Sequence, residues 1–162
     1  MDSVPATRSR PVLANSTQLV PWTSVVIPAV VVIVHMLVVF VHGAAHKQLS
    51  VELPAWAGIY VLCIVGVGPV AGLLLLRSSR QRTGATLLFT TMSGALLFGL
   101  WKHFVAHGPD HVMDLEAGAW RVPFQATAVL LAVSELAGAV VAFRPYYVLT
   151  RQTKARDRGR GY

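Results

Sequence analysis

Four long apolar runs, separated by short polar segments, limit the fold of this 162-residue chain more than any other feature. A hydrocarbon core about 30 Å thick takes roughly 20 residues of helix to cross. Within lipid the backbone must satisfy its own hydrogen bonds, so only helices and closed barrels can span it. We therefore predict an all-α, polytopic integral membrane protein whose four transmembrane helices form an up-down-up-down bundle. The spans are expected at about residues 22–46, 54–76, 83–107 and 123–143.

The composition and the placement of charge agree with a membrane location. Hydrophobic residues make up 54% of the chain and charged residues 13%, which is about half the usual charged share of a soluble domain. The net charge of +7 comes from basic residues that flank the apolar runs, where they suit anionic lipid headgroups. The lipid bilayer is thus the expected partner, and no nucleic-acid partner is expected. The predicted domains are a disordered cytoplasmic arm (1–21), a transmembrane domain (22–146) and a basic cytoplasmic tail (147–162) that is disordered past Thr150.

Lysine and arginine near the span ends predict the orientation, because cytoplasmic loops are enriched in them. The face that holds both termini and the turn at 77–82 carries eleven such residues, whereas the opposite face carries only Lys47, Lys102 and Arg121. We therefore expect cytoplasmic termini and a location in the plasma (inner) membrane. The single cysteine, Cys63, lies within a span, so no intramolecular disulfide can form.

The six histidines gather in two clusters, and the predicted topology brings both toward the extracytoplasmic end. The first cluster occupies the segment HMLVVFVHGAAH and the second occupies HFVAHGPDH. Spacings of four and seven residues place the first cluster on one helix face, and the first two histidines of the second cluster are one turn apart. The members are His35, His42 and His46 in the first cluster, and His103, His107 and His111 in the second.

Two imidazoles one helical turn apart can bind one metal ion, and a facing pair can complete its coordination. Imidazole nitrogen suits Zn, Cu and Fe, so we predict a transition-metal site, with haem as a less favoured occupant. The best candidate ligands are His42, His46, His103 and His107, with Asp110 and His111 as further candidates. Two other interpretations stay open: a pH-sensing or proton-handling cluster, and interfacial histidines that share no role.

A buried polar pair, His35 and Glu135, is predicted deeper in the membrane. Both residues lie near the middle of a span, roughly 17 Å from its outer end at 1.5 Å per residue, and ionisable groups there usually face the bundle interior. A hydrogen bond between them would act as a packing latch or as part of a proton or ligand site. The fourth span surrounds Glu135 with a stripe of small residues, Ala128, Ala132, Ala139 and Ala142.

The paired HxxxH motifs resemble the histidine boxes of membrane di-iron desaturases and hydroxylases. Those families carry more histidines, with an HxxHH box on the cytoplasmic side. This chain lacks the box and places its histidines on the opposite predicted side, so the resemblance transfers no activity. The sequence thus predicts a small membrane protein with a metal site and leaves enzymatic activity open. The alternative is a non-catalytic accessory or scaffold subunit of a larger membrane complex, or a homo-oligomer, held by small-residue helix faces.

Overall fold

The computed structural model describes residues 23–158 of the chain, and every regular element in that range is helical. The prediction of an all-helical chain with four helices long and apolar enough to cross a membrane is confirmed. These helical stretches are Val25–Gln48, Ala55–Leu76, Gln81–Val105 and Arg121–Arg144. The predicted N-terminal arm, 1–21, lies outside the described residues.

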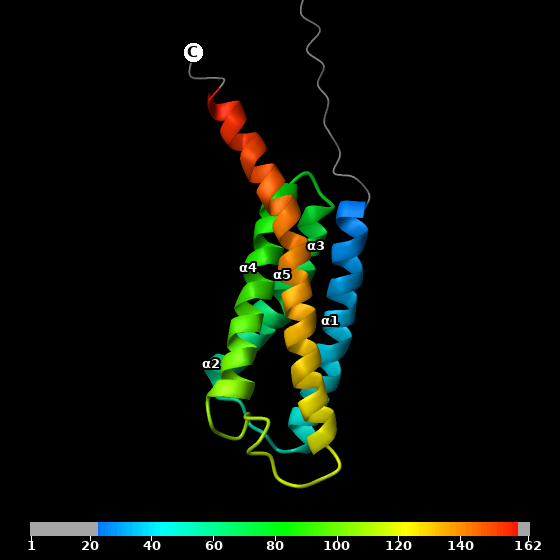
Figure 1. Cartoon of the computed structure of the whole chain (residues 1–162), viewed down its shortest axis with the longest axis vertical. Helices are drawn as coiled ribbons and strands as arrows, with labels where there is room; N and C mark the ends of the chain where they lie inside the picture. Colours follow the sequence, from blue (N-terminus) through cyan, green and yellow to red (C-terminus); the bar gives the residue numbers. More distant parts are fainter. Residues whose placement is uncertain (1–22, 159–162) are drawn as a thin grey trace, which may run out of the picture.

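Figure 1 shows the four stretches running along the bundle, and two of them change helix type along their length. The second stretch begins as α-helix, passes through a π-helical segment and ends as α-helix, and the third ends in a π-helical segment. In chain order the elements are α1 (Thr23–Gln48), α2 (Ala55–Tyr60), η1 (Val61–Val67), α3 (Gly68–Leu76), α4 (Gln81–Leu100), η2 (Trp101–Val105) and α5 (Arg121–Arg158).

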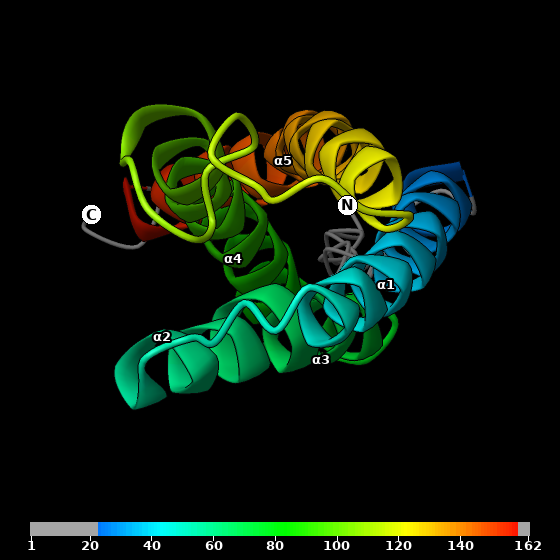
Figure 2. The same cartoon turned by 90° about the horizontal axis from the view of Figure 1, so that it is seen from below.

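The helices are arranged as a ring, seen end-on in Figure 2. Helix α5 packs against α1 on one side and α4 on the other, while α3 packs against α4 and, less extensively, against α1. Helices α1 and α4 therefore lie diagonally across the ring. Helix α2 points away from α1, so the second stretch diverges from the first at the end where α1 finishes.

Glycines allow the second and third stretches to approach closely. A Cβ atom on Gly72 would lie 2.7 Å from the backbone nitrogen of Leu88, and one on Gly84 would overlap the backbone nitrogen of Leu76. Small residues bring helix backbones together in this way in membranes. This small-residue face is therefore occupied by another helix of the same chain.

Two apolar clusters close the ends of the bundle interior. At the α3–α4 turn end, Leu88 and Met92 of α4 are fully buried with neighbours from α1 and α5. At the other end, Leu115 of the loop between η2 and α5 packs with Ala45 and Phe124. This loop, residues 106–120, thus folds over the end of the bundle and contributes a buried side chain to it.

The last helix is longer than predicted. Helix α5 continues to Arg158, so the predicted disorder past Thr150 is wrong over residues 151–158. A helix that is already nucleated gains one hydrogen bond for each residue that it adds, and this segment is rich in good helix formers such as Arg, Gln, Lys and Ala. The Arg151 guanidinium also lies 4.4 Å from the centre of the Tyr147 ring, one turn earlier.

Candidate metal centre

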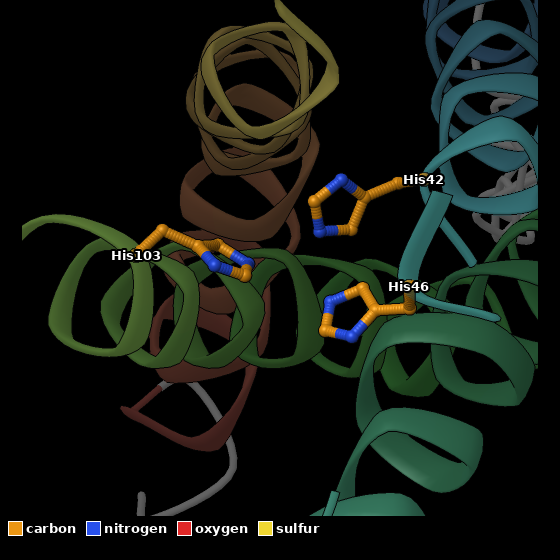
Figure 3. A group of neighbouring side chains, drawn as sticks. All are labelled: His42, His46 and His103. Atoms are coloured by element: carbon orange, nitrogen blue, oxygen red, sulfur yellow. The ribbon is translucent and has the colours of Figure 1, made fainter. Parts of the chain in front are cut away.

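Three histidines from opposite sides of the ring meet at the end of the bundle that the loop covers. His42 and His46 come from the last turns of α1, and His103 comes from η2 (Figure 3). The ring centre of His42 lies 4.8 Å from that of His46 and 4.9 Å from that of His103, and the other pair is 6.1 Å apart. One nitrogen from each ring lies within 4.8 Å of the others. We call these three residues the triad.

Each triad ring has its Nδ1 atom hydrogen-bonded to an oxygen. His103 Nδ1 lies 2.9 Å from the backbone carbonyl of Asp110, and His46 Nδ1 lies 3.4 Å from that of Val51. A carbonyl oxygen only accepts, so in both rings Nδ1 carries the hydrogen and donates it. In a neutral imidazole the other nitrogen, Nε2, then presents a bare lone pair.

His42 has the same tautomer through a side chain. Its Nδ1 lies 2.8 Å from Thr127 Oγ1, and that hydroxyl lies 2.7 Å from the carbonyl of Pro123. The hydroxyl therefore donates to Pro123 and accepts from His42. The His42 Nε2 atom is buried and has no hydrogen-bond partner among the described residues, and a buried acceptor left unpaired costs about 1–3 kcal/mol. The geometry leaves this lone pair free for a ligand.

A carboxylate lies beside the triad. Asp110 Oδ1 is 3.3 Å from His46 Nε2, Asp110 Oδ2 is 3.3 Å from Lys102 Nζ, and the Asp110 side chain is only 5% exposed. With the hydrogen of His46 on Nδ1, both Nε2 and Oδ1 are acceptors. Their contact is favourable only when a proton or a metal cation lies between them.

Local backbone geometry explains how His103 and Asp110 reach the triad. The Ala106 N–H donates to the Trp101 carbonyl at 2.7 Å, an i to i−5 bond that widens the last turn of the third stretch. Gly108 then adopts φ +147°, a region that L side chains rarely enter. The chain turns back there, and the Val112 N–H donates to the His103 carbonyl at 3.0 Å.

The predicted four-histidine set is divided between two groups. His107 joins His111 and Asp114 in a separate group in the loop. The helix ends before His107, and Ala106 has an extended backbone (ψ 114°), so the one-turn spacing of His103 and His107 is not preserved. The His107 side chain is 82% exposed, whereas that of His103 is buried.

This loop group is held by its carboxylate. Asp114 Oδ2 lies 3.0 Å from His107 Nδ1, 3.5 Å from His111 Nδ1, and accepts the Gly108 N–H at 3.2 Å. The hydrogen bond from His107 is the largest of the effects that lower the pKa of the Asp114 carboxyl below its ordinary value. His107 Nδ1 is thus paired with Asp114, and His111 Nδ1 accepts the Met113 N–H at 3.4 Å.

His35 and Glu135 are both buried but do not form the predicted hydrogen bond. His35 Nε2 donates to the Val65 carbonyl at 3.0 Å, and His35 Nδ1 lies 3.2 Å from Ser134 Oγ. The Val65 carbonyl is available because the residue four positions later is Pro69, which has no N–H. Ser134 and Glu135 are adjacent on a helix with 3.6 residues per turn, so they point in directions about 100° apart. The prediction paired the two residues by their depth in the membrane and did not consider the direction in which each side chain leaves its helix.

Glu135 instead faces the same cavity as the triad. This cavity has a volume of about 380 Å³, and both the triad and Asp110 line it together with apolar side chains from all four helical stretches. Glu135 is 2% exposed, and its Oε2 atom has no hydrogen-bond partner in the described part of the chain.

Two contributors to the centre were not predicted from the sequence. Thr127 fixes the tautomer of His42, and Phe124 packs its buried ring against all three triad rings at centre distances of 4.6, 4.9 and 5.6 Å. The role of Thr127 could have been predicted, because a hydroxyl group near the outer end of an apolar span tends to form a hydrogen bond to another helix. The role of Phe124 could not have been predicted, since aromatic residues are common near the ends of transmembrane helices.

No protein-family model, no curated protein and no solved structure matches this chain.

Proposed function

We propose that this chain is an integral membrane protein that binds one transition-metal ion through the Nε2 atoms of His42, His46 and His103. The observation that carries the proposal is the common tautomer of the triad. All three rings have Nδ1 bonded to an oxygen, so each Nε2 atom keeps its lone pair. Histidines that bind metals are held in this way by hydrogen bonds on their other nitrogen.

The surroundings suit a borderline cation such as Zn²⁺, Cu or Fe, which imidazole nitrogen favours. Asp110 lies beside the fourth position without filling it, and Lys102 offsets the charge of Asp110. Three protein ligands with a variable fourth position are typical of sites that exchange a water or a substrate. Phe124 would exclude water from one side of the centre, which strengthens the interaction of the ligands with the ion.

The membrane arrangement that we propose is an up-down-up-down bundle with cytoplasmic termini. Its support is the bias of lysine and arginine toward the face that holds both termini and the 77–82 turn. The triad then lies at the extracytoplasmic end. Single cysteines in place of Ser79 and Gly118, both exposed, test this in a Cys63→Ala background. An impermeant thiol reagent applied to intact cells should label position 118 and spare position 79, and the reverse pattern contradicts the orientation.

The metal proposal is tested on the full chain purified in detergent after treatment with a chelator. Titration with Co²⁺ should give the visible absorption bands of a low-symmetry cobalt site and saturate at one ion per chain. Competition with Zn²⁺ should remove the bands, and elemental analysis should then find one zinc per chain. A titration with no saturable site would overturn the proposal.

A further inference from the structure

The cavity reaches from the triad to Glu135, and a glycine keeps the passage between them open. A Cβ atom built on Gly99 would lie 3.5 Å from Glu135 Oε2 and 4.0 Å from His103 Cδ2. Gly99 therefore sits between the carboxyl group and the nearest triad ring, and both it and Glu135 line the cavity. A larger side chain at this position would project into the space between them.

A metal ion at the triad would leave Glu135 unexplained. Its carboxyl group is nine-tenths buried or more, and Oε2 lacks a hydrogen-bond partner anywhere in residues 23–158. A buried polar atom without a partner is unfavourable by about 1–3 kcal/mol. Native structures seldom retain such an atom unless a ligand, an ion or water pairs with it.

The cavity is too large and too apolar for an ion alone. A volume of about 380 Å³ is within the range of small-molecule pockets, roughly 300–1,000 Å³, and a water molecule occupies only about 30 Å³. The wall of the cavity consists mainly of aliphatic and aromatic side chains, including Val39, Val61, Phe98 and Leu131. Such a wall favours hydrocarbon.

The cavity reaches the surface of the bundle beside Gly43. Gly43 of α1 lines the cavity and is exposed, and the space beside its Cα is open. Large apolar side chains are exposed on both α1 and η1, with Phe40 79% exposed and Leu62 63% exposed. In the proposed membrane arrangement this opening faces lipid, so a lipid-soluble molecule can enter from the bilayer.

We infer that the cavity binds a small, neutral, lipid-soluble molecule that carries a hydroxyl group. The hydroxyl pairs with Glu135, and the hydrocarbon part lies against the apolar wall. A hydroxyl both donates and accepts, so it satisfies a carboxyl group in either protonation state. An amine is disfavoured because a buried ion pair must lose the hydration of both charges and because the cationic Lys47 also lines the cavity. This inference goes beyond the metal proposal and does not require a bound metal.

The test uses the full chain in lipid nanodiscs, in the presence of a chelator, with a diazirine-bearing 4-alkylphenol as the photoreactive probe. Mass spectrometry should find the label on residues that line the cavity. An excess of 4-butylphenol should suppress the labelling, and butylbenzene, which partitions into lipid but has no hydroxyl, should not. Equal suppression by both compounds, or stronger suppression by 4-butylbenzylamine, would overturn the inference.

Variants test whether the labelled molecule binds in this cavity and pairs with Glu135. Gly99→Leu should abolish labelling, whereas Gly58→Leu should not, since a Cβ atom on Gly58 would meet nothing within 4 Å and Gly58 does not line the cavity. Glu135→Leu should weaken protection by 4-butylphenol about tenfold, as loss of one hydrogen bond predicts, and Glu135→Gln should retain most of it. Unchanged labelling in Gly99→Leu would exclude this cavity. Because the chelator removes metal, the labelling experiment tests the cavity alone, and the Co²⁺ titration tests the metal proposal independently of it.

Discussion

The triad consists of three histidines and the loop group of two histidines and an aspartate, and the hydrogen bonding of the two groups also differs. In the triad each Nδ1–H is donated to a neutral oxygen, so each Nε2 atom keeps its lone pair, and that of His46 lies 3.3 Å from Asp110 Oδ1. In the loop group the histidine nitrogens face the carboxylate of Asp114, and His107 is open to solvent. The potential ligands are thus equally close together in the two groups, and the groups differ in the partner of each Nδ1 atom and in the exposure of the rings.

Burial separates the two groups further. A metal ion at the triad would interact with its ligands in a low-dielectric environment that Phe124 helps to form. At the loop group water competes for the ion and for the ligands. We therefore expect tight binding at the triad and weak, readily exchanged binding at the loop group.

The largest expected effect is loss of the metal on removal of a triad ligand. His42→Ala and His103→Ala should each weaken Zn²⁺ affinity by more than about a hundredfold, since changes to the hydrogen-bond partners of a ligand alone cost about 10–100-fold. Competition with a chromophoric chelator measures the affinity. The matched control is His107→Ala, which removes a histidine of the loop group and should leave the affinity of the tight site unchanged. If His107→Ala lowered the Zn²⁺ affinity as much as the triad variants do, the proposed difference in metal binding between the two groups would be wrong.

A smaller effect is expected from the hydroxyl that sets the His42 tautomer. Thr127→Val keeps the shape of the side chain but removes the acceptor for His42 Nδ1–H, so Zn²⁺ affinity should fall by about 10–100-fold. Thr90→Val is the control, because Thr90 also donates to the carbonyl four residues earlier but is exposed on α4. A Thr127→Val protein with normal affinity would show that the tautomer is set by the metal rather than by the hydroxyl.

The carboxylate beside the triad should contribute less. Asp110→Asn retains the size of the side chain and the backbone carbonyl that holds His103, but it removes the charge near His46. The affinity for Zn²⁺ should fall about tenfold, the lower end of the range for outer hydrogen-bond partners. Asp114→Asn, in the loop group, is the control and should have no effect on the tight site. A loss as large as that in His42→Ala would place Asp110 among the direct ligands.

The helical stretches were predictable because their length and apolar character are local properties of the sequence. The His42–His46 pair was predictable for a related reason: a spacing of four keeps its geometry wherever a helix continues. His103 and His107 do not lie together as predicted, because the helix ends between them. A small error in the predicted end of a helix places a side chain on a different surface.

Contacts between helices were harder to predict than the helices themselves. The pairing of His35 with Glu135 relied on depth, which hydropathy supplies, and neglected rotation about the helix axis. His35 in fact reaches a carbonyl freed by Pro69 on another helix. That contact depends on three helices packing in one register, and a single sequence contains no direct record of that register.

The smallest expected effect concerns the loop group and acid. Its hydrogen bond from His107 lowers the pKa of the Asp114 carboxyl below the ordinary 3.8, so the ionised carboxylate stabilises the folded loop. This stabilisation is present above the ordinary pKa and disappears as the pH falls through the lowered one. Carbon-13 NMR of labelled aspartate, with Asp114→Asn to identify the signal, measures the pKa directly. His107→Gln should raise it more than His111→Gln, because the His107 hydrogen bond is the largest contribution and His111 acts only through its charge. The opposite ranking would mean that His111, the buried member, holds the carboxylate, and the loop group would then resemble the triad more closely than its exposure suggests.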